Sequence, residues 1–391
     1  MMDYLNNLLA KPRMAIKILL VLATLNLVIF AWLFGFHPNN DTDSFILMIE
    51  FFRGEQADFH PNRYLSPLYP VVAATLLRFL SPAGSMIAMN IAFYYGIVLL
   101  TYGLFRRVFN SALVGLVSAL IVITAYPMLR YGLTQLQDIG AYCWFVATLY
   151  VAWRWFTEGY DKRWLLLGGV AISFGLLTKE SGAMAAIAFG LLILFSKQSW
   201  KEKAISIGLV AFLPFITVLI NAFRGHEIGV SSLDWYKDNW KVYGPTNYNF
   251  FKWVGVNGSA FNLIWPFAAL GAYWFIKKQS VLPPEAKFYF IAALIPSLSY
   301  LTWPIFIGRT VFISAWLLIP LAAYAIVCLL ENKRTLIIGV FSLLAVLVAP
   351  YILQSTLRYA HIFQILDICK NNIWCSWNYF WDNRGGFSKT M

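Results

Sequence analysis

The 391-residue sequence has little charge: only 12% of its residues are Asp, Glu, Lys or Arg, while 60% are hydrophobic. A soluble domain needs a larger polar surface, so this composition excludes one. Apolar runs of about 20 residues, the length that crosses a bilayer, recur along the whole chain. The sequence therefore predicts an integral multi-pass membrane protein.

Histidine and cysteine are also scarce, with four residues of each. His37, His60 and His226 are too far apart to form a metal cluster by ligand spacing, so we assign no histidine a catalytic role and predict no metal site from them. Cys369 and Cys375 lie in a tail that we expect outside the cell, where a disulfide between them is an open alternative.

The N-terminus lacks the small-residue cleavage site of a signal peptide, and its apolar run, 14–34, is too long for a signal-peptide core. We expect this run to stay in the protein as the first span. Ten more apolar segments bring the expected number of transmembrane helices to about eleven: 84–105, 112–129, 138–156, 164–178, 181–196, 204–223, 259–276, 288–303, 310–330 and 335–354.

The net charge of +12 is explained by orientation rather than by binding to nucleic acid. With a cytoplasmic N-terminus, the short basic loops all fall on the cytoplasmic side: 106–107, 162–163, 197–203, 277–278 and 333–334. This agreement predicts a protein of the cell (inner) membrane, with membrane lipids around it and no nucleic-acid partner.

The predicted fold is therefore an all-α polytopic membrane helical bundle. Residues 1–354 form one transmembrane module with a first outer loop, 35–83, and a second, 224–258, followed by a short outer tail, 355–391. Within the first loop, 65–80 is too short to cross the bilayer and contains Arg78, so we expect it to lie on the surface or to be re-entrant.

The first outer loop concentrates acids where the membrane meets water. Asp41 and Asp43 directly follow the first apolar run. Thr42 to Arg53 is predicted to form an amphipathic helix along the bilayer surface, with Asp43 on its polar side. Either Asp could simply cap this helix. A pair at this position also suits a general base, or a base with a metal ligand, because both roles need an ionised carboxylate that water can reach.

Four more ionic residues have two interpretations each. Lys179 and Glu180 could pair with each other at a tight turn, or Lys179 could hold a lipid phosphate. Arg309 could anchor its helix at the interface or clamp a phosphate with its planar guanidinium. Asp138 could cap its helix or support the site.

The second outer loop is rich in aromatic residues. Trp235 and Tyr236 follow a Ser-x-x-Asp capping pattern and fit an interfacial helix, which makes them candidates for contact with an acceptor.

Several segments together resemble the GT-C superfamily of membrane glycosyltransferases, such as protein mannosyltransferases and aminoarabinose transferases. They are, in chain order, DTDSFILMIEFFRGE, RYLSPLYP, RRVFN, LTKESG and IGRT. The resemblance implies surface helices in the first outer loop and a catalytic base at Asp43 or, failing that, Asp41. It implies donor-phosphate contacts at Lys179 and Arg309. The supporting residues would be Asp138, Glu180, Arg63, Tyr64, Trp235 and Tyr236.

The resemblance further implies a polyprenyl-phosphate sugar donor, because a site on the outer face cannot reach cytosolic nucleotide sugars. The short tail replaces the soluble outer domain of many relatives, which favours a lipid or glycan acceptor over a protein. The expected reaction is an inverting sugar transfer to a hydroxyl group. No cofactor is certain, and a divalent cation between the acids would need a third ligand that is not evident.

Two other functions use the same charges. A transporter or flippase of lipid-linked sugars would bind them without chemistry, but such proteins commonly contain internal repeats, which this sequence lacks. A non-catalytic scaffold would use the acids only as helix caps.

Overall fold

The structure, a computed structural model, describes residues 11–38, 41–229, 234, 236–238, 240–241, 263–277, 283–299 and 311–359. Within these ranges every regular element is helical, which confirms the all-α prediction. Each of the eleven predicted apolar segments contains a helix. How many of them cross the membrane stays a prediction.

The long helices are α2 (Pro12–Leu33), α6 (Pro82–Val108), α7 (Ala112–Thr124), α8 (Asp138–Thr157), α9 (Lys162–Thr178), α10 (Ala185–Phe195), α11 (Trp200–Glu227), α14 (Ile264–Lys277), α15 (Ala286–Ser299), α17 (Leu318–Glu331) and α18 (Leu336–Tyr359). The short elements are α3 (Thr42–Arg53), α4 (Pro61–Tyr64), α5 (Leu68–Thr75), η1 (Met128–Gly132), η2 (Glu180–Ala183) and α16 (Val311–Ser314). Helix α18 thus continues into the predicted tail.

Short polar side chains occupy the N-terminal capping position of several of these helices. Ser81, Ser111 and Asp161 each accept a hydrogen bond from a backbone N–H in the first turn of the helix that follows. Ser199 forms a reciprocal capping box with Glu202 at the start of α11. Such caps satisfy amide groups that the helix itself leaves without partners.

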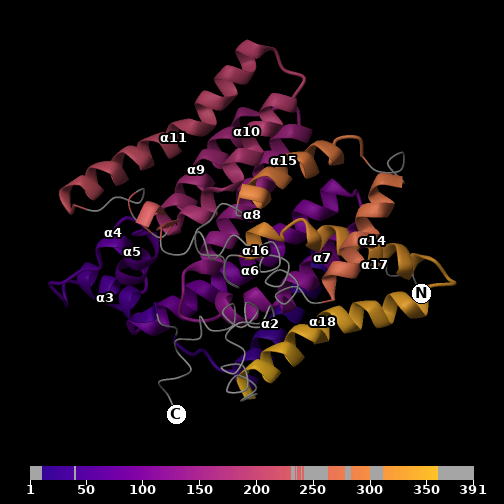
Figure 1. The fold of residues 1–391 in the computed structure, drawn as a ribbon, viewed down its shortest axis with the longest axis horizontal. Coiled ribbons are helices and arrows are strands. Elements are labelled where there is room, and N and C mark those ends of the chain that lie inside the picture. The colour runs from indigo at the N-terminus through magenta and orange to yellow at the C-terminus, as the bar shows by residue number, and fades with distance from the viewer. Residues whose placement is uncertain are drawn as a thin grey trace.

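Helices α6, α7 and α8 form the centre of the bundle. Helix α6 packs against α7 and α8, α8 against α9 and α10, and α7 against α17, which in turn packs on α14 (Figure 1). One continuous apolar core joins these helices. At Gly115 of α7, a Cβ atom would lie 2.8 Å from the carbonyl oxygen of Tyr102, so the absent side chain allows α6 and α7 to approach closely.

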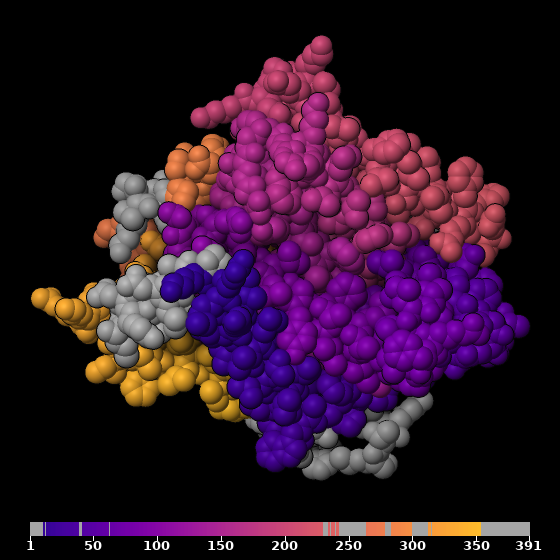
Figure 2. Space-filling model, turned by 180° about the vertical axis from the view of Figure 1, so that it is seen from behind, coloured from indigo at the N-terminus to yellow at the C-terminus, as the bar shows by residue number. Residues whose placement is uncertain are grey.

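The outer helices expose apolar side chains that a soluble protein would bury. Trp32 of α2 is 82% exposed and Phe223 of α11 is 72% exposed, and α18 carries several more exposed apolar residues. Figure 2 shows α2 on the surface of the rear face. Within the described ranges, α2 from Arg13, α6 and α11 are long and apolar enough to cross a bilayer. Large exposed apolar areas on such helices are lipid-facing surfaces, which indicates a membrane protein.

The short helices α3, α4 and α5 lie together on one flank of the bundle (Figure 1). Helix α3 has the predicted bounds, and α5 has eight residues, about 12 Å of helix and far short of a bilayer. A second, smaller core fixes α3 and α5 to α6: Phe45, Ile49, Tyr69, Ala73, Ala74, Met86, Met89 and Leu136.

Candidate functional site

The two acids of the first loop have different surroundings at the start of α3. Asp41 occupies the capping position, yet its carboxylate makes no capping hydrogen bond and instead pairs with Arg63, with 3.4 Å between Oδ1 and Nη2. Asp43 is exposed in the first helical turn, where the helix dipole favours a negative charge. The carboxylate of Asp43 has no ion pair or hydrogen bond with another side chain in the described part of the chain.

Arg63, on α4, fixes the position of Asp41 through several contacts. Its Nε atom donates a hydrogen bond of 3.1 Å to the hydroxyl of Ser44, which itself donates one of 2.7 Å to the Asp41 carbonyl oxygen. The guanidinium group also lies 4.4 Å from the ring centroid of Phe45. The planar group of arginine can make these contacts at once, whereas a lysine ammonium could not.

Hydrogen bonds join the start of α3 to the loop that leads into α8. The hydroxyl of the buried Thr42 donates a bond of 3.1 Å to the carbonyl oxygen of Gln135, and the Gln135 side chain donates one of 3.3 Å to the Phe36 carbonyl oxygen. Residues more than 90 positions apart are therefore adjacent. Sequence patterns along one segment could not reveal this contact.

The first residue of α8, Asp138, forms a buried ion pair with Lys179. Their Oδ1 and Nζ atoms are 2.5 Å apart, and their side chains are 4% and 19% exposed. The expected alternative pairing of Lys179 with Glu180 is wrong, because Glu180 points to solvent at the turn. This turn is tight: a Cβ atom on Gly175 would lie 2.7 Å from the carbonyl carbon of Gly182.

A polar network holds the loop before α8 in place. The Tyr69 hydroxyl donates to the side-chain oxygen of Asn90, whose amide group donates to the carbonyl oxygens of Thr134 and Leu136, the latter over 2.9 Å. All backbone groups in this buried loop need partners, and Asn90 supplies two. The start of α3, the start of α8 and the end of α9 therefore meet at one end of the bundle, which we call the site end.

The remaining predicted site residues are only partly placed. Tyr64 stacks under the guanidinium of Arg224, which lies 4.6 Å from the ring centroid and links α4 to the last turn of α11. Tyr236 has helical backbone and a half-buried side chain. Arg309 and Trp235 lie outside the described residues, as do Cys369 and Cys375.

His60 is a site-end residue that the sequence analysis left without a role. It precedes α4, and burial together with the nearby Arg63 charge lowers the pKa of its imidazole, while Asp41 opposes this effect. Its Nδ1 atom is buried without a hydrogen-bond partner among the described residues. The only sequence signal was its position three residues before Arg63.

The described residues contain no group of three or more His, Cys, Asp or Glu side chains that could hold a metal ion. The two ion pairs, Asp41–Arg63 and Asp138–Lys179, instead combine carboxylates with cations held in position. Such a set can accept a proton at one position and stabilise an anion at another.

Comparison with known proteins finds one family model that matches part of the chain. The family model for dolichyl-phosphate-mannose-protein mannosyltransferases matches residues 66–220. This range includes Asp138 and Lys179 but begins after Asp41 and Asp43. No curated protein matches the sequence.

The fold is similar to that of a solved membrane enzyme. A crystal structure of the Archaeoglobus fulgidus oligosaccharyltransferase, tethered to an acceptor peptide, superposes with a TM-score of 0.55 at 13% identity, over 88% of this chain and 55% of that one. The chain therefore shares its fold with a GT-C enzyme. The predicted resemblance is thereby confirmed.

A second structure supports the GT-C assignment. The archaeal oligosaccharyltransferase AglB from the same organism, in complex with an inhibitory peptide and a dolichol-phosphate, gives a TM-score of 0.55 at 14% identity, over 86% of this chain and 55% of that one. The chain thus spans about half the length of these enzymes.

Proposed function

We propose that this protein transfers a sugar from a polyprenyl-phosphate donor to a hydroxyl of a lipid or glycan acceptor, on the outer face of the cell membrane. The observation that carries the proposal is that the Asp41–Arg63 and Asp138–Lys179 pairs lie on segments that the Thr42–Gln135 hydrogen bond joins at the site end of a GT-C-like fold. The family match and the dolichol-phosphate in the AglB complex support a lipid-linked donor.

Asp43 is the proposed base. Its carboxylate is exposed and is not neutralised by a described cation, whereas Asp41 already shares its charge with Arg63. An exposed, ionised carboxylate can take the proton from an acceptor hydroxyl. The hydroxyl oxygen then bonds to the anomeric carbon as the bond from that carbon to the phosphate oxygen breaks, and polyprenyl phosphate leaves with the bonding electrons. One displacement inverts the anomeric centre.

Lys179 is the proposed contact of the leaving phosphate, with Arg309 as a second cation. An ammonium group that is four-fifths buried stabilises a growing negative charge better than one in water, by about 3 kcal/mol in comparable preorganised sites. Asp138 holds this ammonium group in position in the absence of donor. The donor phosphate would bind beside Lys179, with the sugar toward Asp43.

The test is a transfer assay with purified protein, a radiolabelled polyprenyl-phosphate sugar and a membrane lipid extract as the source of acceptor. Asp43→Asn should lower transfer by roughly 100-fold while the protein remains inserted and folded. Near wild-type transfer by Asp43→Asn together with loss in Asp41→Asn would move the base to Asp41. A flippase would translocate the labelled lipid in vesicles and release no transferred sugar.

The phosphate contact is tested separately by donor titration. Lys179→Ala should raise the KM for donor more than the KM for acceptor, because it removes a charge that holds the donor. Lys201→Ala, which removes an exposed lysine in the first turn of α11, is the matched control. An effect on acceptor KM alone would contradict the assigned phosphate contact.

A further inference from the structure

A cluster of positive charge lies at the end of the bundle opposite the site end. Helix α8 begins at Asp138 in the site and ends at Thr157, about 30 Å away, and α9 runs back from Lys162 to Thr178. The last turns of α6 and α8 and the first turn of α9 bring together five cations and two carboxylates: Arg106, Arg107, Arg154, Lys162 and Arg163 with Glu158 and Asp161.

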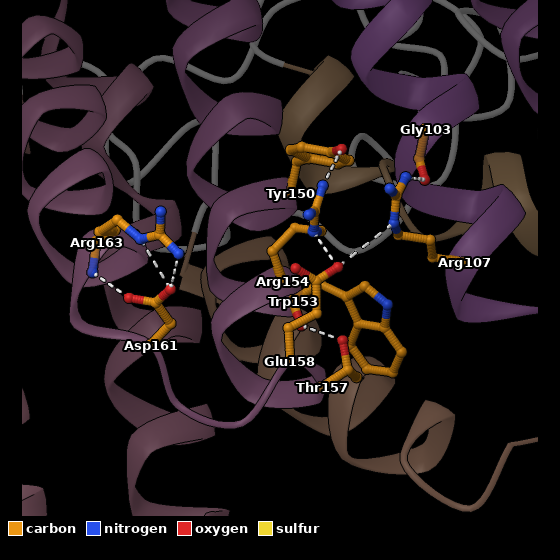
Figure 3. Close-up of polar contacts among 9 residues, drawn as sticks. All are labelled: Gly103, Arg107, Tyr150, Trp153, Arg154, Thr157, Glu158, Asp161 and Arg163. Atoms are coloured by element: carbon orange, nitrogen blue, oxygen red, sulfur yellow. Dashed lines mark hydrogen bonds and ion pairs between the residues drawn. The ribbon is translucent and has the colours of Figure 1, made fainter.

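Glu158 joins the two arginines at the centre of this cluster (Figure 3). Its carboxylate pairs with Arg154 one helical turn away and lies 4.0 Å from the Nε atom of Arg107. Asp161 is engaged separately, since Arg163 donates to it from both its backbone and its side chain. The single carboxylate of Glu158 therefore faces two guanidinium groups, those of Arg107 and Arg154, and their combined charge exceeds its own by one positive charge.

Aromatic rings hold these guanidinium groups in fixed orientations. Arg154 lies 4.3 Å from the ring centroid of Trp164 and donates a hydrogen bond of 3.0 Å to the Tyr150 hydroxyl. Arg107 lies 5.4 Å from the same Tyr150 ring. Arg107 also donates from Nη1 to the Gly103 carbonyl oxygen over 3.3 Å. In each arginine the Nε and Nη1 atoms are thus engaged, and the edge N–H donors of Nη2 are the ones that suit the oxygens of a phosphate.

The cluster lies beside a surface that lipid chains can cover. Leu166 and Leu167, in the first turns of α9 just after Trp164, are about half exposed. A headgroup bound at the cluster would thus leave its acyl chains next to apolar side chains. Tyr and Trp are typical of this depth in a membrane, where the headgroups lie.

We propose that this cluster binds the phosphate of an anionic membrane lipid, with Arg107 and Arg154 as the phosphate contacts. The bound lipid takes up the positive charge that Glu158 leaves uncompensated. The site is separate from the glycosyl-transfer site and does not depend on the proposed reaction.

The test is native mass spectrometry of the purified full chain, released from mixed micelles that contain equal phosphatidylglycerol and phosphatidylcholine. The wild type should retain phosphatidylglycerol, and Arg107→Gln combined with Arg154→Gln should reduce the retained fraction about tenfold. Lys201→Gln, the control at an exposed lysine outside the cluster, should retain as much as the wild type.

Glu158→Gln gives a result of opposite sign, which a purely structural cluster would not produce. It removes the carboxylate that competes for the two guanidinium groups, so it should increase the retained phosphatidylglycerol. If the double variant does not fold, Glu158→Gln alone still tests whether the cluster binds an anionic lipid. Equal retention of the two lipids by the wild type, unchanged or reduced retention in Glu158→Gln, or displacement of the lipid by millimolar inorganic phosphate would overturn the proposal.

Discussion

At the scale of single residues, the site end differs from a set of helix caps in how its charges are paired. Asp41 could have capped α3, but its carboxylate pairs with an arginine 22 positions later in the chain. Asp138 likewise binds Lys179 across two helices. Bringing charges into such pairs costs desolvation energy, so simple structural caps do not account for them.

The rate of sugar transfer should depend on the shape of the Arg63 side chain and not only on its charge. Arg63→Lys keeps the charge but cannot contact both Asp41 and Ser44, so we expect transfer to fall about tenfold with little change in melting temperature. The measurement is kcat with saturating donor, compared with Arg78→Lys, a conservative change at an exposed arginine of the same loop. Equal rates in the two variants would contradict a positioning role for Arg63.

His60 should make the site end sensitive to mild acid. Its pKa is lowered in the folded protein, so the unfolded state binds a proton more readily. Stability from this residue is full above the unfolded pKa of about 6.5 and is lost as the pH falls through the lower folded value. We expect the melting temperature to drop between pH 7.5 and 5, and this drop to be smaller in His60→Gln. Superimposable pH profiles would rule out this role.

At the scale of elements, the sequence predicts the position of a helix wherever a local pattern of apolar residues and end signals marks it. The bounds of α3 follow from its apolar spacing and from Gly54, which ends it in a left-handed conformation with φ of 75°. The apolar segments likewise each contain a helix. Contacts between elements could not be predicted this way, because nothing near Thr42 in the sequence specifies Gln135 as its partner, and nothing near Lys179 specifies Asp138.

One polar residue joins four helices within the bundle. The side-chain amide of Asn26, on α2, donates a hydrogen bond of 2.8 Å to the Tyr94 hydroxyl on α6 and one of 3.1 Å to the Ile123 carbonyl oxygen on α7. Its side-chain oxygen accepts a hydrogen bond from the Tyr351 hydroxyl on α18. Each such bond contributes about 0.6 kcal/mol in membrane proteins. We expect Asn26→Leu to destabilise the protein by about 2 kcal/mol.

The matched control for Asn26 is Asn221 of α11, whose buried side-chain oxygen has no partner among the described residues. Asn221→Leu should be neutral or stabilising, because it removes an unsatisfied polar atom. Thermal melting in detergent compares the two variants. Equal losses in both would mean that the Asn26 network contributes nothing beyond the cost of the substitution itself.

At the scale of the whole molecule, the two ends of the bundle have different chemistry. The site end pairs carboxylates with partly buried cations, while the opposite end carries surplus positive charge and stacked aromatic rings. Because α8 and α9 each span from one end to the other, the same helices position both groups. The fold thereby separates a proposed reaction site from a proposed lipid site by about the thickness of a bilayer.

The central claim is that the first loop and the α9 turn form one donor site, and photo-crosslinking tests it most directly. A polyprenyl-phosphate sugar with a diazirine close to its phosphate would be bound to the purified protein, irradiated and mapped by peptide mass spectrometry. The account predicts labelled peptides from both segments, around Asp43 and around Lys179, and loss of both labels when excess unlabelled donor is present. Labelling confined to the opposite end, around Arg107 and Arg154, would contradict it.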